Sequence, residues 1–156
     1  MTAITSVKNK STDKSLVVTG TDMTTSAAAG VEIKTALDWT KLNWDIDGDD
    51  AATAGKTFVV SEISSAKVTS ATVLTITLTA DAATALEGTV GFAADGLGST
   101  DTNDTIDVAA GFSRDLVGNA ANTHAAAHLS PLYSDGTKPT LARYTSPPAH
   151  CSRTNA

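Results

Sequence analysis

The sequence predicts an all-β fold, a β-sandwich with at most one short helix. The clearest evidence is the segment 73–79. Its Leu74, Ile76 and Leu78 alternate with threonines, and this period of two indicates a strand with one buried and one solvated face. Further short apolar runs, separated by Gly, Asn, Asp and Ser, indicate many short strands joined by turns. A β-rich α+β fold is the alternative.

The other strands are expected on both sides of this segment in the chain. The apolar-polar patterns predict strands over residues 3–7, 15–19, 41–46, 56–60, 63–68, 89–93 and 105–109. Trp44 falls on the apolar side of segment 41–46, so we expect its ring in the core. Segment 3–7 is expected to be an edge strand, which would make strand-to-strand dimers possible. Segment 31–36 fits either a short strand or a helical turn.

One short helix is expected at about residues 81–87. Asp81 can cap its first turn, the alanine content favours a helix, and Gly88 ends it. Residues 113–119 are expected to form a turn, which closes at Gly118 and Asn119 because both tolerate positive φ.

Length and composition indicate a single globular domain. The 156 residues are enough to bury a core, and 41% of them are hydrophobic but only 4% aromatic. The large core side chains must therefore come from Trp39, Trp44, Phe58, Phe92 and Phe112. A formal charge of -6 argues against nucleic acid and anionic membranes as partners. No stretch is long and apolar enough to span a bilayer, so we expect no membrane insertion.

The ends of the chain suggest a domain followed by a linker. The lone Cys151 excludes a disulfide within the chain. Residues 1–4 lack the features of a signal peptide, so an exported parent protein would carry its signal outside this sequence. A polar turn leading to Pro139 is typical of a domain boundary. We therefore expect a sandwich domain over residues 1–133, a linker over 134–140 and an irregular tail over 141–156.

Three phrases of the sequence together resemble a known class of repeats. They are LDWTKLNWDIDG at 37–48, ISSAKV at 63–68 with LTITL at 74–78, and IDV at 106–108 with GFSRDLVGNA at 111–120. The phrases resemble the bacterial Ig-like repeats found in tandem in very large secreted or surface-anchored proteins of adhesin type. The last one is similar to the D-x-x-G-N that closes many such repeats. The resemblance covers about residues 3–133.

This resemblance implies an Ig-like β-sandwich that serves extension, display or adhesion outside the cell or on its surface. Its partners would be neighbouring repeats of the same parent chain and cell-surface or matrix ligands. Residues 135–140 look like the junction to a following repeat, and 144–147 like its first residues. Residues 148–156 resemble neither repeat nor linker, which suggests an artefact of cloning or reading frame. A sandwich does not by itself specify a function.

The strongest candidate site is a run of acids with the chemistry of a calcium site. Its members are Asp45, Asp47, Asp49 and Asp50, with Gly48 among them to let the backbone turn. Calcium prefers such hard oxygen ligands, although the spacing is not that of an EF-hand loop. A second acidic loop, 101–104 with Asp107 after it, would contribute if the two loops met. The alternative is that both loops are solvated turns.

Packing in the core is the favoured interpretation of Trp39. Its place in the pattern is more open than that of Trp44, so a carbohydrate platform is the alternative. His124 and His128 would share one face of a helix and could hold zinc, or they are simply surface residues. Arg114 and Asp115 are expected to fix a loop through hydrogen bonds to the backbone.

The sequence, with its resemblance, favours a non-catalytic structural or adhesive module of a larger extracellular or cell-surface bacterial protein. A calcium-dependent or carbohydrate-binding module is the alternative, and it requires an exposed Trp39 or convergent acidic loops. The chain has no G-x-S-x-G motif and no evident His-acid pair, so we do not expect an enzyme.

Overall fold

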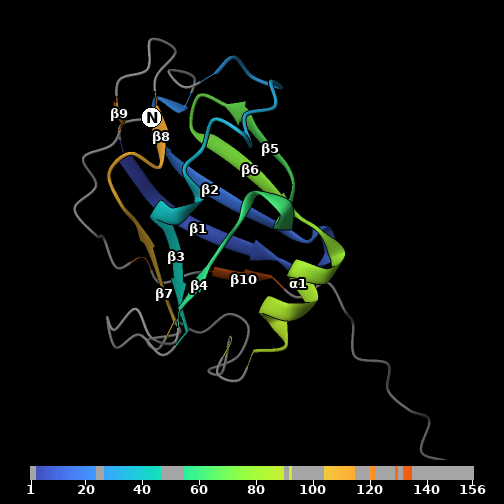
Figure 1. Ribbon diagram of the computed structural model, residues 1–156. Helices are drawn as coiled ribbons and strands as arrows, with labels where there is room; N and C mark the ends of the chain where they lie inside the picture. The colour runs from blue at the N-terminus through green and yellow to red at the C-terminus, as the bar shows by residue number, and fades with distance from the viewer. Residues whose placement is uncertain are drawn as a thin grey trace, which may run out of the picture.

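Two β-sheets face each other across a shared core, with one short helix at their side (Figure 1). The computed structural model describes residues 3–23, 27–46, 55–89, 92, 104–114, 120–121, 129 and 132–134. Within these residues the fold is mostly strand, in the two-layer arrangement of an all-β sandwich. The predicted fold class is therefore confirmed.

The larger sheet has the strand order β10-β1-β2-β6-β5. Its strands are β1 (Ala3–Lys10), β2 (Ser15–Thr21), β5 (Ile63–Ser70), β6 (Val73–Leu78) and β10 (Leu132–Ser134). Neighbouring strands are antiparallel except β1 and β10, which run parallel.

The smaller sheet has the antiparallel order β4-β3-β7. It consists of β3 (Leu42–Asp45), β4 (Lys56–Thr57) and β7 (Thr105–Val108). A further antiparallel pair joins β8 (Ser113–Arg114) to β9 (Ala120–Ala121). The helices are α1 (Ala80–Glu87) and the short 3-10 turns η1 (Ser11–Asp13), η3 (Trp39–Lys41) and η4 (Val60–Glu62).

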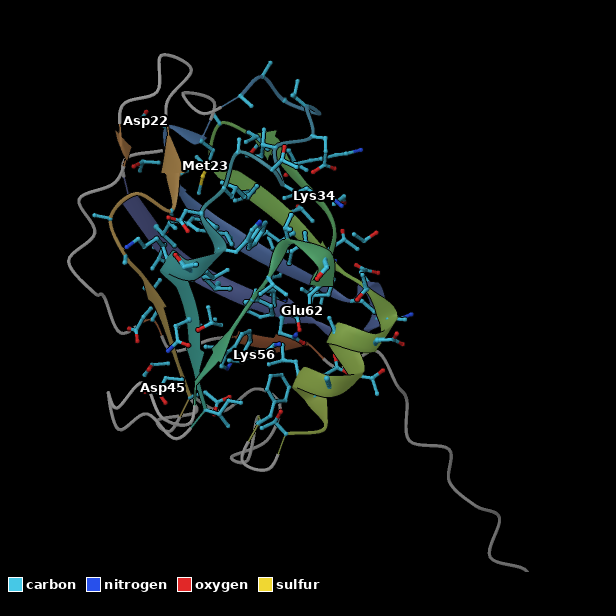
Figure 2. The ribbon with its side chains drawn as sticks, in the orientation of Figure 1. Asp22, Met23, Lys34, Asp45, Lys56 and Glu62 are labelled. Atoms are coloured by element: carbon cyan, nitrogen blue, oxygen red, sulfur yellow. The ribbon has the colours of Figure 1, made fainter. Side chains whose placement is uncertain are left out.

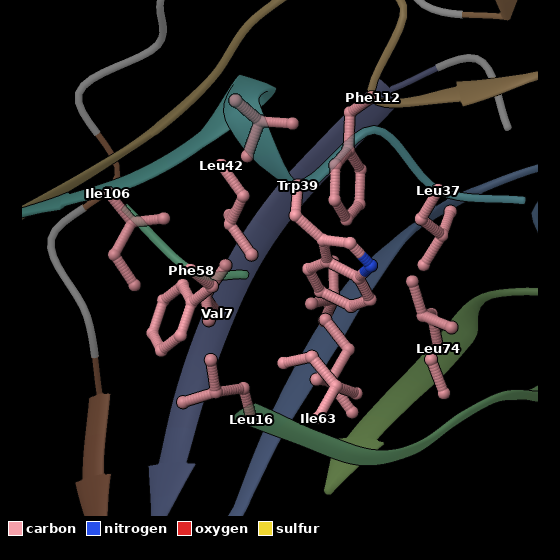
Figure 3. Packing of buried hydrophobic residues seen from close by; sticks show 14 of the residues in the cluster. Val7, Leu16, Leu37, Trp39, Leu42, Phe58, Ile63, Leu74, Ile106 and Phe112 are labelled. Carbon is pink, nitrogen blue, oxygen red and sulfur yellow. The ribbon is translucent and has the colours of Figure 1, made fainter. Parts of the chain in front are cut away.

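The core lies between the two sheets and is built from alternate residues of their strands. In β6 the alternation is as predicted: Leu74, Ile76 and Leu78 are buried, and the threonines between them are half-buried. Figure 3 shows side chains of the larger sheet, such as Leu16 and Leu74, facing Trp39, Leu42 and other residues of the opposite layer. Burial of this apolar surface is the main stabilising contribution to such a fold.

The expected strand over residues 3–7 is the first part of β1, which continues to Lys10. Residues 3–7 pair with β2, whereas β10 pairs with β1 on its other side only at Lys8–Lys10. A local pattern indicates that a segment is a strand but carries no information about its neighbours, and β10 joins β1 from more than 120 residues away in the chain.

Strand β5 is the edge strand on the side of the larger sheet opposite β10. It is covered by the segment for which the sequence predicted either a short strand or a helical turn. Gly30 N–H donates to Val68 O at 2.7 Å, and Ile33 N–H donates to Ala66 O at 2.8 Å. Between them the Glu32 carboxylate accepts from Ala66 N–H at 2.7 Å. Backbone groups of Ala66 and Val68 on the free side of β5 are thus bonded within the chain. These bonds protect the edge against pairing with another molecule.

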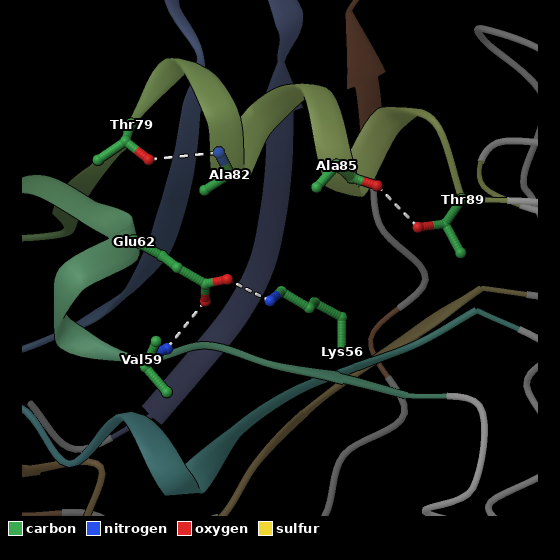
Figure 4. Close-up of polar contacts among 7 residues, drawn as sticks. All are labelled: Lys56, Val59, Glu62, Thr79, Ala82, Ala85 and Thr89. Carbon is green, nitrogen blue, oxygen red and sulfur yellow. Dashed lines mark hydrogen bonds and ion pairs between the residues drawn. The ribbon is translucent and has the colours of Figure 1, made fainter.

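The helix is present, but Thr79 caps it in place of Asp81. The Thr79 hydroxyl oxygen accepts from Ala82 N–H at 3.3 Å (Figure 4). Asp81 lies in the first turn, where its charge suits the positive end of the helix dipole. Gly88 is the C-cap, as predicted, and its N–H donates to Thr84 O at 2.9 Å.

Three other boundaries differ from the expectation. Strand β4 ends at Thr57, because the chain then turns into η4 instead of continuing to residue 60. Thr89 and Phe92 lie in a turn closed by Phe92 N–H donating to Thr89 O at 3.1 Å, so the strand expected over 89–93 is wrong there. Ser113 and Arg114 form β8 where a turn was expected, and residues 115–119 lie outside the described residues.

The predicted linker over 134–140 overlaps the last described strand by one residue. Ser134, the first residue of the predicted linker, is the last residue of β10. The remainder of the linker and the tail over 141–156 lie outside the described residues. In the part of the chain that is described, no helix is long and apolar enough to cross a membrane.

We predict that Ile76→Ala lowers the free energy of unfolding by about 2–5 kcal/mol, because it leaves a cavity in the middle of the core. The neighbouring Thr77→Ala, on the other face of β6, should cost less than about 1 kcal/mol. Urea unfolding followed by circular dichroism measures both. Equal losses would contradict the assignment of the two faces.

We also predict that Glu32→Ala exposes the edge of β5. Loss of the carboxylate leaves Ala66 N–H without its acceptor, which costs about 1–3 kcal/mol and opens a strand edge to pairing. Light scattering after size exclusion should show association at high protein concentration. The matched variant Glu32→Gln keeps an oxygen acceptor and should stay closer to the wild type. A monomeric Glu32→Ala of unchanged stability would refute the protective role.

Candidate functional site

The two acidic segments of the sequence join the fold at the same end of the smaller sheet. Strand β3 ends at Asp45, and Asp45 lies directly opposite Thr105, the first residue of β7 (Figure 2 labels Asp45). After β3 the described residues end at Ile46, and before β7 they begin at Asp104. Asp47, Asp49, Asp50 and residues 101–103, which complete the predicted calcium loops, lie outside the described residues.

Asp104 lies on the core side of this sheet. It is fully buried, and its Oδ2 accepts from the Trp44 indole Nε1–H at 3.2 Å. A buried tryptophan needs an acceptor for this N–H, and Asp104 supplies it at the end of the core. The predicted inward position of Trp44 is confirmed, and its ring also packs on Phe92 with centroids 5.3 Å apart.

Asp45 and Asp107 belong to the opposite face of the sheet. Successive residues of a strand point to alternate faces, and Trp44 and Ile106 are both in the core. The outward face therefore carries Asn43, Asp45, Thr105 and Asp107, which we call the outer cluster. The acids near the end of the sheet are thus divided between its two faces, a split that depends on register and not on their spacing in the sequence.

The outer cluster is bounded by β4. The Thr57 hydroxyl donates to Asn43 Oδ1 at 3.4 Å. Gly55 lies against the Asn43 amide so closely that a Cβ there would come within 2.6 Å of Asn43 Oδ1. The Asn43 side chain therefore forms the wall of the cluster on the β4 side.

Trp39 packs in the core and is not the exposed platform that carbohydrate binding would need. Only 5% of Trp39 is exposed, and its indole Nε1–H donates to Lys34 O at 2.8 Å. Its ring meets that of Phe112 edge to face, with centroids 5.7 Å apart (Figure 3). Trp39 is the first residue of η3 and belongs to the core cluster, so it offers no platform for a carbohydrate.

An ion pair that the sequence reading missed joins the two layers. Lys56, on β4 of the smaller sheet, pairs with Glu62, directly before β5 of the larger sheet (Figure 4). The second carboxylate oxygen of Glu62 accepts from Val59 N–H at 3.0 Å. Both side chains are partly buried, at 29% and 24% exposed. Their six-residue separation fits no regular period, so no sequence pattern pointed to them.

The pKa of Glu62 lies below its ordinary value. Burial alone would raise this pKa, but the hydrogen bonds from Lys56 and from Val59 N–H, together with the charge of Lys56, lower it by more. The ionised carboxylate is thus the form that the fold stabilises.

The remaining candidate residues lie mostly outside the described part of the chain. His124, His128 and Asp115 are among them, and Arg114 is placed only as a backbone position in β8. Within the described ranges, no three His, Cys, Asp or Glu side chains come together in a way that could hold a metal ion. A metal site in these ranges would therefore need oxygen ligands other than carboxylates, such as a hydroxyl or a carbonyl, in addition.

Comparison with protein-family models, with curated proteins and with solved structures gives no match for the chain.

We predict that Glu62→Ala lowers the free energy of unfolding at neutral pH by about 1.5–3 kcal/mol, since it removes two hydrogen bonds to a charged group. Asp13→Ala is the matched control. It breaks the exposed pair of Lys10 and Asp13, whose side chains are 40% and 55% exposed, and should cost less than about 1 kcal/mol.

The effect of Glu62 should depend on pH. Because the folded-state pKa is lowered, the stabilisation is present above the ordinary value of 4.5 and is lost as the pH falls through the folded-state pKa. The stability difference between wild type and Glu62→Ala should therefore shrink in acid, as measured by urea unfolding at several pH values. A difference that grows in acid would contradict the assignment.

Proposed function

We propose that this domain is a non-catalytic structural or adhesive module, one Ig-like sandwich of a larger extracellular or cell-surface bacterial protein. The observation that carries the proposal is the parallel pairing of β1 with β10. Lys8 lies opposite Leu132 and Lys10 opposite Ser134, so the first and last described strands run in the same direction.

This pairing separates the two ends of the described fold. The chain enters β1 at Ala3, beside the N label in Figure 1, and leaves β10 at Ser134, level with Lys10 at the far end of β1. At roughly 3.3 Å per residue, the seven steps from Ala3 to Lys10 span about 23 Å. A domain entered at one end and left at the other suits a tandem array that extends in one direction, which is the arrangement the resemblance implies.

The strand order supports the Ig-like part of the proposal. In immunoglobulin domains, strands A, B, E and D form one sheet, and strands C and F lie together in the other. Here β1, β2, β6 and β5 are adjacent in that order, and β3 pairs with β7. Taken in chain order, β1, β2, β3, β5, β6 and β7 therefore correspond to strands A, B, C, D, E and F.

The surface also suits a module that stands beside copies of itself. The edge of β5 is covered by residues 30–33, and the outward face of β6 carries Thr75 and Thr77. A formal charge of -6 adds repulsion between copies. Neighbouring repeats would therefore be held apart and linked only through the chain. The carbohydrate-binding alternative loses its support, because Trp39 is buried.

Small-angle X-ray scattering of two copies of residues 1–140 joined in tandem would test the proposal. A compact globule of 280 residues would have a radius of gyration of roughly 19 Å, against about 14 Å for one copy. We expect the tandem protein to exceed the compact value clearly, because each copy continues from the far end of the one before it. A value near 19 Å would mean side-by-side packing and would overturn the extended arrangement.

A further inference from the structure

The outer cluster places four oxygen-bearing side chains on one face of two paired strands. Asp45 lies opposite Thr105, and Asn43 lies opposite Asp107. Directly opposite residues of an antiparallel pair have Cβ atoms about 4.5–5.5 Å apart, and diagonal neighbours are about 7–8 Å apart. The side chains of Asp45, Thr105 and Asp107 can therefore reach a common point above the sheet.

Two members of the outer cluster are buried although the cluster faces away from the core. Asp45 is 1% exposed and Thr105 is 9% exposed. Oδ1 of Asp107 is also covered from solvent.

The side chain of Thr105 is the observation that points to a ligand at the outer cluster. Its Oγ1 is buried and makes no hydrogen bond within the part of the chain that the structure describes. Buried hydroxyl groups in native proteins nearly always have a partner, and an exception indicates a bound water or ion. Because Thr105 lies on the outward face directly opposite Asp45, the missing partner of its hydroxyl belongs in the same place as the carboxylates.

We propose that the outer cluster binds a hard divalent cation, calcium by preference, through the carboxylates of Asp45 and Asp107 and the hydroxyl of Thr105. All three ligands are oxygens, which hard cations prefer, and two carboxylates balance a charge of two. Calcium accepts six to eight oxygens in flexible geometry, with waters among them, whereas magnesium requires a nearly ideal octahedron. Three side chains fixed by strand register suit the less demanding ion.

Asn43 is not a ligand in this proposal. Its Oδ1 already accepts from Thr57, and its amide is packed against Gly55. It closes the site on the β4 side. The bound ion would then tie β3 to β7 across the sheet, in addition to their backbone hydrogen bonds. The inference does not depend on the proposed function, because a tandem protein can be extended with or without this ion.

The test is calcium binding by the full chain after treatment with a chelator. Isothermal titration with calcium chloride should give a dissociation constant on the order of 10⁻⁴ to 10⁻³ M, the range of extracellular modules. Thermal unfolding should show a Tm several degrees higher in excess calcium than in chelator. Magnesium at the same concentration should produce a smaller shift.

Thr105→Val separates a ligand from a merely buried hydroxyl, because valine has nearly the shape of threonine. In chelator this variant should melt at or above the Tm of the wild type, since it removes an unsatisfied polar atom. In calcium it should lose at least about tenfold in affinity, as should Asp45→Asn. Thr105→Ser keeps the hydroxyl and should keep the calcium-dependent shift. Asp13→Asn removes one negative charge elsewhere and should bind calcium normally.

Two results would overturn the proposal. One is a wild-type Tm that is the same in millimolar calcium and in chelator. The other is calcium binding that Thr105→Val and Asp45→Asn leave unchanged, which would place the ion elsewhere. Neither result requires a variant to be more stable than the wild type, and the first requires no variant at all.

Discussion

The burial of Trp44 is the constraint on which the rest of the smaller sheet depends. Its indole lies in the core, packs on Phe92 and donates to Asp104. With Trp44 pointing inward, the alternation of the strand forces its neighbours Asn43 and Asp45 to the other face. Since β7 pairs in register, Ile106 joins Trp44 in the core and Thr105 and Asp107 join Asp45 outside. The inward position of the Trp44 ring therefore determines which acidic side chains share the outer face of the sheet.

The two layers are held in place by two kinds of interaction of different strength and range. Apolar packing between the sheets is non-directional and supplies most of the stability. The pair of Lys56 and Glu62, with the bond from Val59 N–H, is directional and fixes the path by which the chain crosses from β4 to β5. Packing therefore brings the layers together, and this ion pair helps to set where the crossing chain lies between them.

The proposed function and the proposed cation site use different parts of the molecule. Extension depends on β1 and β10 and on the covered edge of β5, all in the larger sheet. The outer cluster lies on the smaller sheet, on the face turned away from the core. A cation bound there would stiffen the unit without changing where the chain enters and leaves. Such a module could respond to calcium while it keeps its length.

The sequence by itself determined the fold class, the central strand β6, the inward position of Trp44 and the approximate place of the helix. Each of these depends on neighbouring residues, because strand and helix periods are local. Only the tertiary structure decided that β10 pairs with the end of β1, that Trp39 is buried, and that Asp45 shares a face with Thr105 and Asp107 but not with Asp104. These facts depend on pairing and register between distant segments. A shift of one residue in register would reverse the faces while leaving every local pattern unchanged.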